Sequence, residues 1–113
     1  MSLVYKLIDR PAWEAAAAKG VFEGSAVDLA DGFIHLSSAL QAPETARRYF
    51  KGQGDLLLVA IDAEDLGVGL RWEPSRGGDL FPHLYGSLPT AMASWTRPVA
   101  LGPDGAPILG YLA

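Results

Sequence analysis

The 113-residue sequence contains no cysteine and only two histidines. These counts exclude a disulfide framework, a thiol nucleophile, an iron–sulfur cluster and an ordinary structural zinc site. The chain also has no Ser-His-Asp signature and no Walker phosphate-binding loop. We therefore expect no metal and no required cofactor, so any chemistry has to come from a few ordinary acid, base and hydrogen-bonding side chains.

Long apolar runs and an excess of basic residues are also missing. Charged side chains interrupt every window that is long enough to span a membrane, and the start MSLVYKLIDR lacks the apolar core of a signal peptide. The formal net charge is −4, whereas non-specific binding to a duplex requires Lys and Arg against several phosphates. We expect a cytoplasmic protein without a membrane or nucleic-acid partner, whose oligomeric state the sequence leaves open.

Hydrophobic periodicity and turn residues predict an α+β fold with two helices in the N-terminal half. No repeat, linker or low-complexity segment divides the chain, so we expect one domain over residues 1–113. Residues 75–89 show little periodicity and contain three glycines, which is typical of a functional loop. The predicted helices are residues 10–20 and 43–52, and the predicted strands are 3–8, 33–37, 55–62 and 70–75, with a closing hairpin of 95–101 and 107–112.

The first candidate group lies in the segment GFIHLSS, residues 32–38. His35 is placed inside a predicted strand and Ser37 at its end, and a neutral imidazole can bind a ribose hydroxyl or a carbonyl. The alternative is a core histidine that main-chain groups satisfy, with a serine that only caps a turn.

The second candidate group lies in LRWEPSRGG, residues 70–78. Arg71 and Glu73 are two residues apart, so on a strand they project from the same face. Arg76 precedes two glycines, and its planar guanidinium suits a phosphate or a carboxylate. The alternative is a surface ion pair worth less than about 1 kcal/mol, followed by an ordinary glycine turn.

The third candidate group is FPHLYG, residues 81–86. Tyr85 can stack on a flat ring while His83 hydrogen-bonds to the same ligand. Alternatively, the aromatic side chains of this segment only anchor it to the core. Both histidines, Arg71, Arg76 and Trp72 fall in three short segments, and we predict that one concave site collects them.

Several segments in order resemble the bacterial domain of unknown function 952 (DUF952) family. They are the start VYKLIDRPAWEAA and the strings GFIHLSSALQAPETARRYFKG, DLLLVAID and LRWEPSRGGDLFPHLYGSLP. The fold of this family is similar to that of ADP-ribosyltransferases, in which a split, mostly antiparallel sheet holds NAD in a cleft. The resemblance therefore implies this fold and a nucleotide cleft for nearly the whole chain.

The resemblance also implies roles for single residues. His35 matches the histidine that binds the adenosine ribose in histidine-type members of that superfamily. Tyr85 or Trp72 matches the aromatic residue that sandwiches the nicotinamide, and Arg71 or Arg76 matches the basic residue on the pyrophosphate.

ADP-ribosyl transfer commonly uses a glutamate on a late strand, and here this sequence departs from the pattern. After Glu73 the only acidic residues are Asp79 and Asp104, so Glu73 is the candidate for stabilising the positive charge of the transition state. The related RNA 2′-phosphotransferases use His and Arg without that glutamate, but they carry an additional nucleic-acid-binding domain, for which this chain lacks the length.

We therefore predict a cleft that binds a nucleotide resembling NAD or another small anion. ADP-ribosyl transfer or NAD cleavage is the enzymatic form of this prediction, and the alternative is a non-catalytic ligand-binding or partner-binding domain. The candidate catalytic residues are Glu73 and His35. The candidate binding residues are His35, Ser37, Arg71, Arg76, His83 and Tyr85.

Overall fold

Two apolar strands form the centre of the fold in the computed structural model, which describes residues 2–112. Strand β1 (Leu3–Asp9) is antiparallel to β4 (Leu56–Asp62), with Val4 opposite Ile61 and Leu7 opposite Leu58. All residues of β4 except the last are buried. A strand that is apolar at nearly every position can be stable only if both of its faces are covered.

All strand pairs in the described part of the chain are antiparallel. The helices are α1 (Arg10–Lys19), α2 (Ala26–Asp31), α3 (Ala42–Tyr49) and α4 (Ala63–Leu66). The remaining strands are β2 (Val21–Phe22), β3 (Ile34–His35), β5 (Leu70–Pro74), β6 (Leu80–Leu84), β7 (Leu88–Pro89), β8 (Ala93–Leu101) and β9 (Pro107–Ile108). The protein thus has the expected α+β fold, and none of the helices within residues 2–112 has the length and apolarity to cross a membrane.

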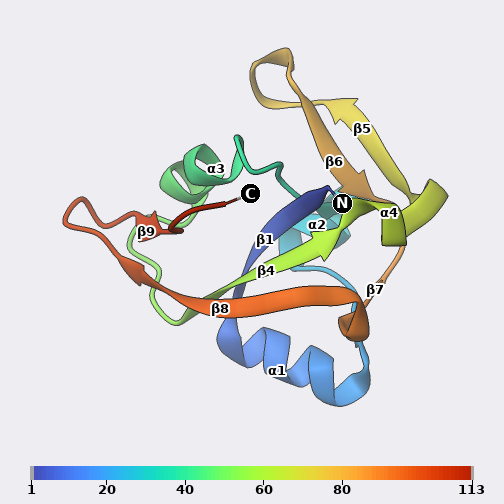
Figure 1. Ribbon diagram of the computed structural model, residues 1–113, viewed down its shortest axis with the longest axis horizontal. Helices are drawn as coiled ribbons and strands as arrows, with labels where there is room; N and C mark the ends of the chain where they lie inside the picture. Colours follow the sequence, from blue (N-terminus) through green and yellow to red (C-terminus); the bar gives the residue numbers. More distant parts are fainter. Residues whose placement is uncertain (1, 113) are drawn as a thin grey trace.

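The strands form three sheets. The main sheet has the order β1-β4-β8-β9, a second has the order β3-β6-β5, and β2 pairs with β7. The β5–β6 hairpin projects away from the main sheet as an arm (Figure 1). Its tip contains Gly77 and Gly78 at φ +70° and +84°, a backbone conformation that glycine adopts without strain. The two glycines after Arg76 are therefore explained by the turn.

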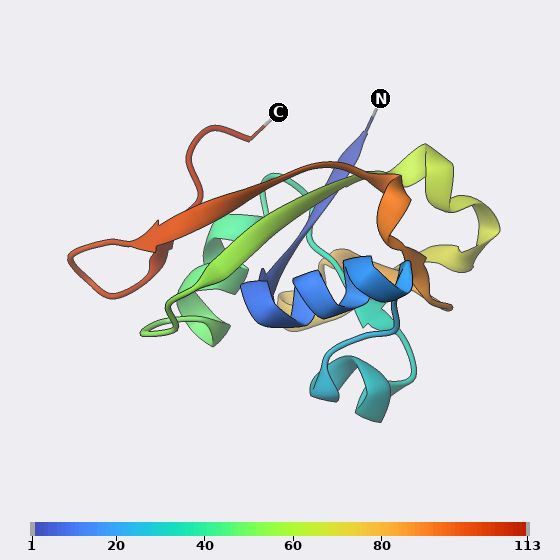
Figure 2. The same ribbon diagram turned by 90° about the horizontal axis from the view of Figure 1, so that it is seen from below.

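Helices cover both faces of β1 and β4. Trp13 and Ala16 of α1 pack against Val4, Ile8 and Val59 on one face, where Figure 2 shows α1 beneath the strands. On the opposite face Ala42 and Ala46 of α3 join Tyr5, Leu7, Leu56 and Leu58. The strand predicted over residues 3–8 is thus confirmed, and its apolar side chains divide between the two clusters.

Local sequence signals located most of the regular elements. The carboxylate of Asp9 accepts a hydrogen bond from the Ala12 N–H at 2.9 Å, and Gly20 ends α1 at φ +92°, as the sequence predicts. The prediction of helix 43–52 corresponds to α3, which ends three residues earlier. The strands predicted at 3–8, 55–62 and 70–75 are β1, β4 and β5, and the closing hairpin is formed by β8 and a shorter β9.

The prediction of a loop over residues 75–89 is wrong in its centre. Residues 80–84 form β6, the middle strand of the second sheet, and Phe81 to Leu84 are buried. Pairing with β5 and β3 stabilises this strand although its sequence has no clear period, because tertiary contacts outweigh a weak local preference.

Two further differences lie nearby in the chain. Helix α2, between β2 and β3, is absent from the prediction. The strand predicted over 33–37 is shorter in the structure, since only Ile34 and His35 belong to β3 and Ser37 forms an isolated bridge with Tyr5.

Substitution of the core tests this packing. We expect Ile61→Ala, at a fully buried position, to lower the free energy of unfolding by about 2–5 kcal/mol, because it leaves a cavity between β4 and its covering elements. Val68→Ala is the matched control, since Val68 is 99% exposed, and should change it by less than about 0.5 kcal/mol. Equal effects in urea titrations would contradict the assigned core.

Candidate functional site

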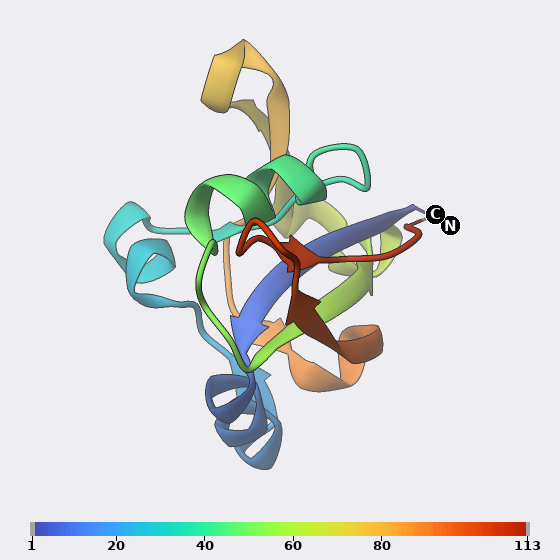
Figure 3. The same cartoon turned by 90° about the vertical axis from the view of Figure 1, so that its left-hand side faces the viewer.

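A cavity of about 740 Å³ lies along the free edge of β1. Its walls come from β1, α2, α3 and the start and centre of β6, and Figure 3 shows α2 and α3 on the side of β1 that faces away from β8. The volume falls in the range of about 300–1,000 Å³ that is typical of small-molecule sites. Four of the predicted site residues line the cavity, namely His35, Ser37, Arg76 and His83.

The other predicted residues lie outside the cavity lining. Arg71, Trp72 and Glu73 belong to β5, and Tyr85 directly follows β6. Arg71 and Glu73 do share a face, because the Arg71 guanidinium lies 4.8 Å from the centre of the Tyr85 ring while Glu73 accepts a hydrogen bond from the Tyr85 hydroxyl at 2.8 Å. Trp72 is half-exposed on the arm.

A buried carboxylate organises one end of the cavity. Asp28 is 2% exposed, and its oxygens accept hydrogen bonds from the Ser25 N–H at 2.8 Å and the His35 N–H at 3.1 Å. The Lys6 ammonium lies 3.0 Å from Asp28 Oδ2 and donates to the His35 carbonyl at 2.9 Å. Asp28 therefore connects β1, the start of α2 and β3 through one side chain.

Burial and the partner's charge shift the pKa of Asp28, and that of Lys6, in opposite directions. Burial raises the pKa of Asp28, but Lys6 and the hydrogen bonds from His35 and Ser25 outweigh burial, so the Asp28 pKa lies below its ordinary value. Burial lowers the pKa of Lys6 from its ordinary value, and the attraction of Asp28 offsets this only in part. The two groups are 3.0 Å apart, so each supplies the charge that compensates the burial of the other.

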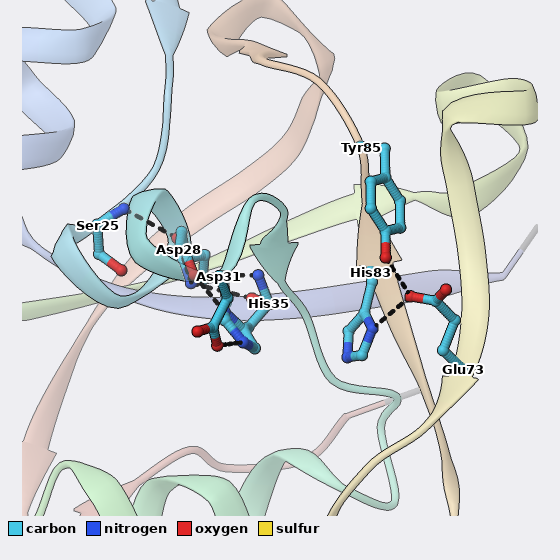
Figure 4. A network of polar contacts seen from close by, with 8 residues as sticks. Ser25, Asp28, Asp31, His35, Glu73, His83 and Tyr85 are labelled. Atoms are coloured by element: carbon cyan, nitrogen blue, oxygen red, sulfur yellow. Dashed lines mark hydrogen bonds and ion pairs between the residues drawn. The ribbon is translucent and has the colours of Figure 1, made fainter.

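Both ring nitrogens of His35 face carboxylates. Nδ1 lies 2.7 Å from Asp28 Oδ1, and Nε2 lies 2.9 Å from Asp31 Oδ2 (Figure 4). An ionised carboxylate only accepts hydrogen bonds, so both contacts are satisfied when the ring carries a hydrogen on each nitrogen. His35 thus lines the cavity with both of its polar atoms already engaged.

The second histidine belongs to a different network. His83, which is 4% exposed, has its Nδ1 2.8 Å from Glu73 Oε1, and the Tyr85 hydroxyl donates to the same oxygen at 2.8 Å (Figure 4). The bonds from His83 and Tyr85 hold the pKa of Glu73 below its ordinary value, and the bond to Glu73 raises the pKa of Tyr85. Glu73 is therefore a carboxylate, and Tyr85 is a neutral phenol.

The Phe33 ring contacts both histidine rings. The Phe33 ring stacks on His83 with centroids 4.0 Å apart and lies 4.6 Å from His35. The histidine rings themselves are 5.6 Å apart. Phe33 therefore restricts the plane of the His83 ring, and the three rings pack together in one cluster.

Arg76 supplies positive charge at the other end of the cavity. Its guanidinium lies 4.9 Å from the centre of the Phe81 ring and makes only long contacts, of 3.4 Å, to the Thr45 hydroxyl. That hydroxyl is also 3.1 Å from Ser37 Oγ. Within residues 2–112, Arg76 forms no ion pair with an acidic side chain, so its charge is available to an anion.

The free edge of β1 adds main-chain groups to the cavity. The Tyr5 N–H and C=O bond to the main chain of Ser37, at 2.8 and 2.9 Å. Main-chain groups of a strand point to alternate sides, so those of Leu7 point to the same open side. Leu7 lines the cavity, and neither its N–H nor its C=O has a hydrogen-bond partner in the described part of the chain.

Sequence reasoning did not identify Lys6, Asp28, Asp31, Thr45 or the main chain of Leu7. A signal for Asp28 was present, because Ser25 and Asp28 form a capping box at the start of α2, and the S-x-x-D pattern is visible in the sequence. The other groups carry no local signal, since they enter the site only through tertiary packing. Among residues 2–112, no three His, Cys, Asp or Glu side chains are arranged to share a metal ion.

Comparison with known proteins places the chain in a family. The family model described as "Protein of unknown function (DUF952)" matches residues 7–96. The chain belongs to the DUF952 family. No match was found among curated proteins.

Solved structures support the membership. The crystal structure of protein CC0527 from Caulobacter crescentus is 54% identical in sequence to this DUF952 protein, with a TM-score of 0.94 and 96% of each chain covered. The solution NMR structure of CC0527 is 55% identical, with a TM-score of 0.88, and the match covers 97% of this chain and 95% of that one.

The buried ion pair can be tested by removing one charge. We expect Asp28→Asn to lower the free energy of unfolding by about 3–5 kcal/mol, because it leaves the Lys6 charge without compensation. Asp55→Asn is the matched control, since Asp55 pairs with Arg10 at the exposed surface, where the cost should stay below about 1 kcal/mol. Chemical denaturation at neutral pH measures both values.

The same variant tests the direction of the pKa shift. Because the Asp28 pKa is lowered by folding, its carboxylate stabilises the fold fully above the unfolded pKa and loses this effect as the pH falls through the folded one. The stability difference between wild type and Asp28→Asn should therefore shrink below about pH 4. A difference that stays constant with pH would contradict the assignment.

Proposed function

We propose that this DUF952 protein binds a dinucleotide resembling NAD in the cavity along β1. The observation that carries the proposal is the guanidinium of Arg76, which lines the cavity without an acidic partner in residues 2–112. A planar guanidinium binds phosphate oxygens through two parallel hydrogen bonds. The hydroxyls of Ser37 and Thr45 lie beside it and can complete such a phosphate site.

The edge of β1 supports a ligand that carries an amide. The N–H and C=O of Leu7 offer one donor and one acceptor side by side, and unpaired main-chain groups in a concave site favour a polar partner over an apolar one. The carboxamide of nicotinamide also has one acceptor and one donor group. We therefore assign the carboxamide to Leu7 and the pyrophosphate to Arg76.

The ADP-ribosyltransferase-like fold remains part of this proposal. It is supported by the α+β class, by the separate antiparallel sheets and by the resemblance of the DUF952 family to that fold. The role proposed for Arg71 is dropped, because its guanidinium lies over Tyr85 outside the cavity lining. His35 lies on the cavity wall, but both of its ring nitrogens contact carboxylates, so it shapes the wall and does not bind the ribose.

Titration calorimetry with NAD and ADP-ribose tests the phosphate site. Arg76→Gln should weaken the binding of both ligands by about ten- to hundredfold, because a charge-assisted hydrogen bond contributes about 1.5–3 kcal/mol. Arg71→Gln removes the same charge from the same arm but outside the cavity, and it should retain the wild-type affinity. Equal losses in the two variants, or no binding by the wild type, would contradict the proposal.

A second comparison tests the amide site without a mutation. Nicotinic acid adenine dinucleotide differs from NAD in carrying a carboxylate in place of the carboxamide. We expect it to bind at least about tenfold more weakly, because a carboxylate has no N–H for the Leu7 carbonyl and leaves that group unpaired. If both dinucleotides bind equally while Arg76→Gln still abolishes binding, the Leu7 assignment is wrong and the phosphate site stands.

A further inference from the structure

The two edges of the His83 ring have different surroundings. Nδ1 points to Glu73, which lies outside the cavity lining, whereas the His83 side chain itself lines the cavity. Nε2 has no partner in the described residues, although every fully buried side-chain nitrogen or oxygen there has one. Nε2 is therefore accessible from the cavity.

The contact with Glu73 determines where the ring hydrogen lies. Glu73 is ionised and can only accept, so Nδ1 donates, and the neutral ring carries its hydrogen on Nδ1. The lone pair is then on Nε2, the atom that faces the cavity. The same Glu73 oxygen also accepts a hydrogen bond from the Tyr85 hydroxyl, so it has two donors, Tyr85 and His83 Nδ1.

The ring is also held in its plane. Phe33 stacks on one side at 4.0 Å, and His83 is fixed in the sheet by the pairing of β6 with both β3 and β5, opposite His35 and Arg71. A base that is held in one tautomer and one orientation loses little entropy when it accepts a proton.

We infer that His83 accepts the proton in a hydrolysis of the ligand and that Glu73 is a positioning residue that acts through it. This inference rests on the proposed function and names its reaction. A water oxygen bonds to C1′ of the nicotinamide ribose while the C1′–N1 bond breaks. The electron pair of that bond passes to the pyridinium ring, which leaves as neutral nicotinamide. Nε2 takes the proton of the water, and the products are nicotinamide and ADP-ribose.

This assignment differs from the one that the sequence suggests. Glu73 was the candidate for contacting the reacting ribose, but its Oε1 binds both His83 and Tyr85, and its side chain lies outside the cavity lining. We therefore assign the reacting group to the imidazole of His83, which contacts Glu73 and lines the cavity.

The tautomer can be measured on the free protein. With only two histidines in the chain, imidazole ¹⁵N chemical shifts assign each ring once His83→Gln has removed one set of signals. At a pH where the ring is neutral, His83 should carry its hydrogen on Nδ1, and Glu73→Ala should remove this preference. Glu23→Ala, which breaks a surface pair with Lys19, should leave it unchanged. A wild-type ring with its hydrogen on Nε2 would overturn the inference.

The reaction itself is tested by measuring nicotinamide release at saturating NAD. His83→Gln still offers an amide N–H to Glu73 but cannot accept a proton, so it should lower kcat by about a hundredfold or more. Its affinity for ADP-ribose should stay within about threefold of the wild type, which shows that the variant is folded. Glu73→Ala should also lower kcat, because a smaller fraction of His83 rings then carries its hydrogen on Nδ1 and presents a lone pair at Nε2.

The possible outcomes distinguish a failure of the hydrolysis inference from a failure of the binding proposal. If the wild type binds NAD but releases no nicotinamide, or if His83→Gln releases it at the wild-type rate, the inference is wrong and the binding proposal stands. If the wild type does not bind NAD at all, the proposed function is wrong and the inference falls with it.

Discussion

The ion pair between Asp28 and Lys6 is the interaction on which the arrangement of the cavity depends. A carboxylate buried in this way is stable only if charges and hydrogen bonds replace its lost water, and here they come from β1, the first turn of α2 and the main chain of β3. Lys6 and Asp28 are 22 positions apart, so their pair holds β1 against α2 and β3. The wall of the cavity that carries His35 follows from this constraint.

The two histidines show how environment separates identical side chains. His35 lies between two carboxylates, so both of its nitrogens have partners within the protein. His83 meets one carboxylate and keeps its second nitrogen for the cavity. With two acidic neighbours both ring nitrogens are engaged, whereas with one acidic neighbour the second nitrogen stays open to the cavity. Phe33 packs against both rings, which also contact each other edge to face.

The cavity itself exists because β1 is an edge strand that is only partly covered. Ser37 pairs with Tyr5, and the chain then turns away into α3, which leaves the main chain of Leu7 open in the cavity that Arg76, Ser37 and Thr45 also line. An exposed edge would invite pairing with another strand, but this one lies inside a hollow between helices. The hollow shields this edge from pairing with another strand, and the main-chain N–H and C=O of Leu7 are open to a ligand there.

The sequence by itself determined the strong local elements and the family. Asp9, the alanine run and Gly20 define α1, and the apolar run of residues 56–61 defines a strand covered on both faces, because these signals act over a few residues. It also indicated both histidines and Arg76 as site residues. Only the tertiary structure decided that residues 80–84 form a central strand, that Asp28 and Lys6 meet, and that Glu73 lies behind His83 and not in the cavity. The pairing of β6 with β3 and the contacts of Asp28 with Lys6 and of Glu73 with His83 join residues that are ten or more positions apart, and a local pattern carries no information on such pairs.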